Sequence, residues 1–144
     1  MANLGIKKTS AAVGARNKGV KGENIRMTNK DIYIYADKLQ CFYSCDIIMP
    51  VKINFYLNKN IELIRQAANN IELARLNIGK RFGVRDNDGY IIQNEHLIEA
   101  ENEINNLFNL EQDLPIHIFK LSDFDGIELT YQQMSAIMFM VEED

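Results

Sequence analysis

Apolar residues recur at the three- and four-residue spacing of an amphipathic helix over most of the chain after Thr28. The longest such run covers residues 51–82, and only Arg75 interrupts its apolar stripe. The stripe consists of Leu57, Ile61, Ile64, Ala68, Ile71, Ile78 and Phe82. A helix of this length measures roughly 45 Å, which is longer than a small core can cover. We therefore expect this helix to pair with another long helix or to project from the domain.

A shorter helix is predicted before it, over residues 29–44. Ile32, Ala36 and Leu39 lie at helical spacing there, and Thr28 is a suitable N-cap residue. The run 32–35 (Ile-Tyr-Ile-Tyr) would also suit a strand, because β-branched and aromatic residues favour pleated surfaces. The spacing continues beyond this run, so we favour the helix.

A second long helix is predicted over residues 94–112, where Leu97, Ala100 and Ile104 recur at helical spacing. The segment 86–89 (Asp-Asn-Asp-Gly) between the two long helices is a strong turn signal. Two helices joined by a short connection favour an antiparallel hairpin.

The last third of the chain predicts one strand and one further helix. Residues 115–119 alternate in the manner of a half-buried strand, and Thr130 begins a C-terminal helix. Residues 27–144 are thus expected to form one α+β, mainly α-helical domain. In it, a long antiparallel helical hairpin (51–82 and 94–112) is flanked by an N-terminal helix, a short strand or hairpin, and a C-terminal helix.

Charge is distributed unevenly along the chain. Residues 1–30 contain seven Lys or Arg and one Glu, whereas residues 94–144 contain one Lys and twelve Asp or Glu. Residues 1–26 also contain four glycines and no apolar periodicity. We therefore predict a flexible basic arm over residues 1–26, attached to an acidic body.

The cationic residues of this arm could contact phosphates, or an acidic protein surface that includes the C-terminal third of a second copy. They are Lys7, Lys8, Arg16, Lys18, Lys21 and Arg26. The arm has no aromatic residue to stack on bases, and the acidic body would repel a phosphate backbone. Nucleic-acid association through the arm is therefore the alternative function.

A partial match to a calcium-binding loop surrounds Gly89. With this glycine at loop position six, Asp86, Asp88 and Glu95 occupy positions three, five and twelve. The first position is Val84, which supplies no carboxylate ligand. We favour a turn with capping carboxylates, and we expect no metal ion and no cofactor.

Catalytic and membrane signals are weak. His96 lies among glutamates and is expected to be a solvated helix residue, and His117 is expected to point outward from a half-buried strand. The sequence contains no recognisable Ser/His/Asp or Cys/His motif for nucleophilic catalysis and no phosphate-binding loop. No apolar run approaches the roughly 20 residues of a membrane span. We therefore expect neither an enzyme nor a membrane protein.

The body of the chain, residues 28–143, resembles short accessory proteins encoded by tailed bacteriophages and prophages. The resemblance is carried by the Pro50 start of the long helix with its segment 71–75, by Phe82-Gly83 before the turn, and by 121–130 with the acidic end 142–144. It excludes the arm and assigns no residue a role. It implies a phage-encoded protein of the host cytoplasm or the virion.

We therefore expect a non-catalytic protein that binds a phage structural protein or a host protein, in particle assembly or in inhibition of a host or defence factor. The expected contact surface is an acidic helical face together with the C-terminal acids. Its residues are Glu95, Glu99, Glu103, Glu142, Glu143 and Asp144. The partner's identity and the oligomeric state, including a homo-oligomer, stay open.

Overall fold

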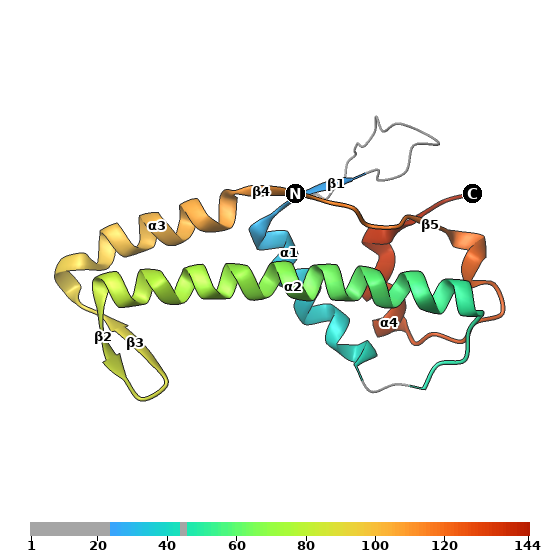
Figure 1. The fold of residues 1–144 in the computed structure, drawn as a ribbon, viewed down its shortest axis with the longest axis horizontal. Coiled ribbons are helices and arrows are strands. Elements are labelled where there is room, and N and C mark those ends of the chain that lie inside the picture. The colour runs from blue at the N-terminus through green and yellow to red at the C-terminus, as the bar shows by residue number, and fades with distance from the viewer. Residues whose placement is uncertain (1–23, 44–45) are drawn as a thin grey trace.

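The computed structural model describes residues 24–43 and 46–144 of the chain, and its fold is α+β and mainly helical, as predicted (Figure 1). The helices are α1 (Asn29–Lys38), α2 (Val51–Phe82), α3 (Leu97–Asn109) and α4 (Tyr131–Ile137). The strands are β1 (Ile25–Thr28), β2 (Gly83–Asp86), β3 (Gly89–Ile92), β4 (Glu111–Leu114), β5 (Phe119–Lys120) and β6 (Val141–Glu142).

Helix α2 runs through the whole length of the molecule and has the predicted bounds (Figure 1). Pro50 precedes its first turn, where a missing N–H costs no helical hydrogen bond. The helix ends at Gly83, whose backbone is extended. A Cβ atom at Gly83 would lie 2.6 Å from the carbonyl oxygen of Ile91, so β3 can approach here only because the residue is glycine.

Helix α1 confirms the helical interpretation of residues after Thr28. The Thr28 hydroxyl accepts a hydrogen bond from the Asp31 N–H at 3.1 Å, as expected of an N-cap. The α-helix is shorter than predicted, because Leu39–Phe42 form a 3₁₀ turn. Ile32 is fully buried, and α1 crosses the middle of α2 (Figure 1).

The segment between α2 and α3 contains the predicted turn, and the structure adds a two-stranded antiparallel hairpin around it. Strands β2 and β3 pair from Gly83–Ile92 to Asp86–Gly89. Asn87 has a positive φ of 52°, which its short polar side chain tolerates. Helix α3 then runs antiparallel beside the end of α2, as predicted, but it covers only part of 94–112. The first three residues of that range form a 3₁₀ turn, and its last two belong to β4.

Strand β1 corrects the predicted boundary of the basic arm. It pairs antiparallel with β4, so that Ile25 lies opposite Leu114 and Thr28 opposite Glu111. Met27 is buried, and Arg26 belongs to the folded part of the chain. The prediction missed this strand because its partner lies more than eighty residues away in the sequence.

The predicted strand over 115–119 is largely wrong. Only Phe119 and Lys120 form a strand, which pairs in parallel with β6. The segment before them is held by a side chain: the Asn60 Oδ1 accepts from the His117 N–H at 2.9 Å, and the Asn60 Nδ2 donates to the His117 carbonyl at 2.8 Å. The predicted C-terminal helix is confirmed as α4, with a reciprocal cap between Thr130 and Gln133.

The hydrophobic core lies toward one end of α2. Among the described residues, the buried apolar side chains outside the main cluster are Ile78 and Ala100. We call residues 24–71 and 110–144 the compact half, and residues 72–109 the distal half. The main cluster contains Met27, Ile32, Leu39, Ile53, Leu57, Ile61, Ile64, Ala67, Ile71, Leu114, Ile116, Phe119, Phe124, Ala136, Ile137 and Met140. No helix in the described ranges is long and apolar enough to cross a membrane.

Candidate protein-contact surfaces

The structure separates the two groups of acids that were expected to form one surface. Helix α3 lies beside the C-terminal end of α2, whereas the chain ends near the other end of α2 (Figure 1). Strand β6, which carries Glu142, is paired with β5 in the compact half. The long helix holds the two groups apart, so they do not form one continuous surface, and the role of each group in partner binding stays a prediction.

The acids of α3 do not all share one face either. The side chains of Glu95 and Glu99 are 75% and 67% exposed. The Glu103 carboxylate instead faces α2, where its Oε1 lies 3.0 Å from Nη1 of Arg81. Four residues turn a helix by about 40° beyond a full circle, and this rotation carries Glu103 from the exposed face toward α2.

The C-terminal acids make contacts within the chain. The Glu142 carboxylate lies 3.3 Å from Nζ of Lys120, and the Asp144 Oδ1 accepts from the Ser122 N–H at 2.9 Å. Hydrogen bonds from the Ser122 side chain and backbone lower the pKa of Asp144. Glu143 is exposed. These residues therefore attach the chain end to the compact half, in addition to adding negative charge.

Exposed apolar side chains lie on both halves, and the sequence analysis did not select those of the distal half. Val84 and Ile91 lie directly opposite each other in the hairpin, so their side chains share one face, and they are 49% and 55% exposed. Leu97 and Ile98 at the start of α3 are 43% and 74% exposed. We call these four residues the distal apolar group. The β-branched and aromatic residues on either side of the predicted turn, Val84 and 90–92 (Tyr-Ile-Ile), are the sequence signal that could have identified the hairpin pair.

A polar junction joins the two halves. The Tyr33 hydroxyl of α1 donates a short hydrogen bond to Glu72 of α2, and Glu72 also accepts from Arg75 at 2.7 and 3.0 Å. Hydrogen bonding from Arg75 lowers the pKa of Glu72, and the bond to Glu72 raises the pKa of Tyr33. The Tyr33 ring meets Phe108 of α3 edge-on at 5.4 Å. This network explains why Arg75 interrupts the apolar stripe.

Asn29 strengthens the same junction from a buried position. Its Nδ2 donates to the Leu107 carbonyl at 2.9 Å, and its Oδ1 accepts from Nε2 of Gln112 at 2.8 Å. The Asn29 N–H also donates to the Leu110 carbonyl at 2.8 Å. The bonds to the Leu107 and Leu110 carbonyls attach α1 to the C-terminal end of α3, where the Leu107 carbonyl also accepts from the Leu110 N–H at 3.3 Å.

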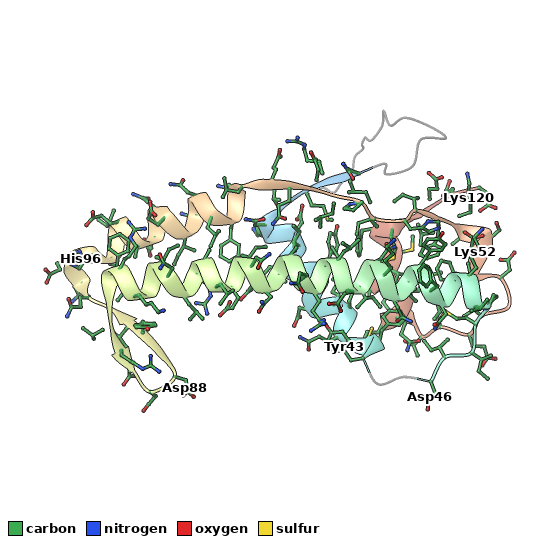
Figure 2. All side chains as sticks on the ribbon, in the orientation of Figure 1. Tyr43, Asp46, Lys52, Asp88, His96 and Lys120 are labelled. Carbon is green, nitrogen blue, oxygen red and sulfur yellow. The ribbon has the colours of Figure 1, made fainter. Side chains whose placement is uncertain are left out.

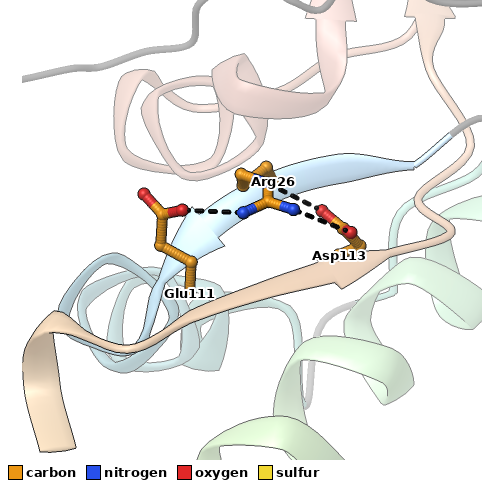
Figure 3. A network of polar contacts seen from close by, with 3 residues as sticks. All are labelled: Arg26, Glu111 and Asp113. Carbon is orange, nitrogen blue, oxygen red and sulfur yellow. Dashed lines mark hydrogen bonds and ion pairs between the residues drawn. The ribbon is translucent and has the colours of Figure 1, made fainter.

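Arg26 was predicted to be an arm residue, and the structure places it against acids of its own chain (Figure 3). Its Nη1 lies 2.9 Å from Oε1 of Glu111, and its Nε lies 3.2 Å from Oδ1 of Asp113. The hydrogen bond with Glu111 and the charge of Asp113 raise the pKa of Arg26. All three side chains are substantially exposed, so this network adds little stability.

The other predicted arm contacts lie outside the described residues. They are Lys7, Lys8, Arg16, Lys18 and Lys21. Their contact with phosphate or with an acidic surface therefore stays a prediction.

The predicted turn within the partial calcium motif lies at Asn87 and Asp88. Asp86 ends β2, Asp88 lies in the turn, and Glu95 lies in a separate 3₁₀ turn. In the part of the chain that the structure describes, no three His, Cys, Asp or Glu side chains gather in a way that could hold a metal ion.

His117 does not occupy the predicted setting, and His96 does so only in part, because its side chain is 38% exposed beside Glu95 and Glu99. His96 is partly buried, with its ring 5.8 Å from that of Phe82 and its Nδ1 3.5 Å from Oε1 of Glu99. His117 stacks on Tyr56 with ring centroids 4.1 Å apart and does not stand outward from a strand. Both side chains are therefore packing residues.

Comparison of the chain with protein-family models, with curated proteins and with solved structures finds no match in any of the three. The proposals below therefore depend on the surfaces and contacts of the molecule itself.

Proposed function

We propose that the protein is a non-catalytic binding protein that acts through protein–protein contacts of its distal half. The observation that carries this proposal is the distal apolar group, whose four side chains stand exposed around the base of the hairpin and the start of α3. Apolar side chains gathered at the surface of a small domain are typical of protein contact sites. Burial of these side chains in a partner would release free energy that the isolated chain does not gain.

The charge of the same region indicates the chemistry of the partner. Glu95, Glu99 and Glu101 are exposed beside Leu97 and Ile98. A partner surface with an apolar centre and surrounding Lys or Arg would match this arrangement, and the opposite charges would speed association and favour one orientation. The resemblance to phage accessory proteins suggests a virion protein or a host protein as the owner of that surface. Assembly and inhibition of a host or defence factor are the corresponding roles.

A photo-crosslinking experiment tests this proposal. A photoreactive phenylalanine analogue replaces Ile98 in the full chain, and the matched control places the same analogue at Tyr131, which is 90% exposed in the compact half. Both proteins are irradiated in phage-infected host cells. We expect a discrete crosslinked protein from position 98 and not from position 131.

The charge requirement is tested in the same experiment with the triple variant Glu95→Gln, Glu99→Gln, Glu101→Gln. We expect the position-98 crosslink to weaken as the carboxylates are removed, whereas Glu62→Gln on the exposed face of α2 should leave it unchanged. Equal crosslinking from positions 98 and 131, or none from position 98, would contradict the proposal.

A further inference from the structure

A second surface with its own chemistry lies at the opposite end of α2 from the distal apolar group. Residues 51–61 include Lys52 and Lys59 and no Asp or Glu. The N-terminal end of a helix adds partial positive charge to such a segment. Figure 2 labels Lys52 at this end of the molecule and Asp88 and His96 at the other. This segment of α2 is therefore positively charged on a chain whose net charge is −4.

The two lysines share a helix face with aromatic residues. Lys52, Phe55, Tyr56 and Lys59 follow the spacing of residues that lie side by side on one face. Phe55 is 58% exposed, and the Lys59 Nζ lies 6.0 Å from the centre of its ring. Lys52 and Lys59 are roughly 10 Å apart along the helix axis, with Phe55 between them. A planar group stacked on Phe55 would therefore lie near both cations, with the Lys59 ammonium already over the ring.

Packing holds this aromatic surface in position. The Phe55 ring meets Tyr56 edge-on at 5.1 Å, and Tyr56 stacks on His117 at 4.1 Å and 12°. His117 in turn meets the buried ring of Phe119 at 4.8 Å. The hydrogen bonds between Asn60 and the His117 backbone fix the position of this histidine. Phe55 is thus the exposed end of a series of rings that begins in the core.

The electrostatic setting of His117 agrees with a local excess of positive charge. Burial lowers its pKa first, and the charges of Lys52 and Lys59 lower it further, against an opposing effect of Asp123. His117 is therefore biased toward its neutral form, which keeps the stack with Tyr56 free of an additional buried charge.

We propose that Lys52, Phe55 and Lys59 form a binding site for single-stranded nucleic acid, with an unpaired base stacked on the Phe55 ring and neighbouring phosphates bound by the two lysines. Base–aromatic stacking together with phosphate neutralisation is the usual chemistry of such sites. A duplex is a poorer match, because its bases are already stacked and paired. The site supplies the aromatic group that residues 1–26 lack, and it is independent of the protein contacts proposed for the distal half.

Fluorescence anisotropy with the full-length protein tests this site. The probes are two labelled strands of equal length, one with bases and one with abasic nucleotides, so that only the first can stack. We expect wild type to bind the base-bearing strand more tightly at low salt. Phe55→Ala should weaken that binding about tenfold and abolish the preference, because one stacked base is lost. Phe55→Leu, which keeps the apolar area but has no ring, should also lose the preference.

The lysines are tested by salt dependence. The double variant Lys52→Gln, Lys59→Gln should reduce the slope of log K against log salt by about 1.4, since each phosphate contact with a single strand contributes about 0.7. Matched controls are Tyr131→Ala, which removes an exposed ring elsewhere, and Lys80→Gln in the last turn of α2. Circular dichroism checks that each variant keeps its helices.

Several results would overturn the site. One is equal wild-type affinity for the base-bearing and abasic strands, or no binding of either at low salt. The other is an unchanged preference in Phe55→Ala. An effect of Tyr131→Ala as large as that of Phe55→Ala would likewise assign the stacking to other residues.

Discussion

The compact and distal halves share α2, yet they are held together differently. The compact half contains the main hydrophobic cluster, whereas the buried apolar side chains of the distal half are Ile78 and Ala100. The distal half relies instead on partly buried contacts, on the ion pair of Arg81 with Glu103, and on the junction around Tyr33 and Asn29. A region with so few buried side chains is expected to open locally while the remainder stays folded. A continuous helix such as α2 is thus not equally stable against local unfolding along its whole length.

The prediction with the largest expected effect on stability compares two isoleucines on α2. Ile64 is fully buried in the main cluster, and Ile78 is buried in the distal half. Ile64→Ala should lower the free energy of unfolding by about 2–5 kcal/mol. Ile78→Ala should cost less, about 2 kcal/mol, because the thin distal half can relax around the cavity.

Urea denaturation gives both losses, and hydrogen exchange locates them. The Ile78 variant should accelerate exchange chiefly in α3 and the hairpin, and the Ile64 variant throughout. Equal losses with identical exchange patterns would make the two halves one cooperative unit.

The next largest effect is expected at Asn60, which holds the backbone of His117 within the compact half. Asn60→Leu leaves the His117 N–H and carbonyl without their partner and should cost about 2 kcal/mol. Asn58→Ala, on the exposed side of the same helix, should change stability by less than about 0.5 kcal/mol. The measurement is again urea denaturation, and similar losses in the two variants would argue against the clamping role of Asn60.

A smaller effect is expected at the junction. Tyr33→Phe removes the hydroxyl that binds Glu72 but keeps the ring contact with Phe108. Because the hydroxyl lies at the surface, the cost should be near 0.5 kcal/mol. Amide exchange should increase in α3 and not in α4, and Tyr131→Phe serves as the control. Faster exchange in α4 would place the effect in the compact half instead.

The smallest effect concerns pH. Burial holds the pKa of His117 below its ordinary value of 6.5. Below pH 6.5 the unfolded chain therefore binds a proton that the folded chain does not, and stability falls as the pH is lowered toward the folded-state pKa. Solvent screening of this partly exposed ring makes this loss the smallest of the effects considered.

Two measurements check this sign. A titration of the His117 ring by NMR should give a midpoint below 6.5, and His117→Phe should lose less stability than wild type between about pH 7 and pH 5.5. Stability that rises in wild type as the pH is lowered over this range would contradict the assignment.

The helices could be predicted because local information specifies them. The apolar stripe of α2 and the caps at Thr28 and Thr130 lie within a few residues of the elements they define. Even the interruption at Arg75 proved to be a contact with Glu72, one turn away on the same helix. The turn around Asn87 is equally local.

Strands β1 and β4, and the side chain that replaces a strand partner at His117, were not predictable from one sequence. Strand β4 reads Glu-Gln-Asp-Leu, a composition unfavourable to strands, and it forms because β1 supplies a partner from far along the chain. The alternation over 115–119 resembles a strand, but the side chain of Asn60 takes the place of a neighbouring strand at His117. A buried asparagine on an apolar helix carries no signal of what it will bind.

The candidate surfaces also show this difference between local features, which the sequence predicts, and long-range contacts, which it does not. Exposed acids could be named individually, but their separation by the length of α2 could not be read from the sequence. The wrong assignment of Arg26 has the same cause, since Glu111 and Asp113 become its neighbours only through strand pairing.

The uninterrupted course of α2 has a geometric consequence. One residue inserted into its middle would move the distal half about 1.5 Å along the axis and rotate it by about 100° relative to Lys52 and Phe55. A deletion would rotate it by the same angle in the opposite sense. The helix therefore fixes both the distance between its two ends and the angle between the surfaces at those ends. Whatever binds at its two ends is held at a defined spacing and orientation.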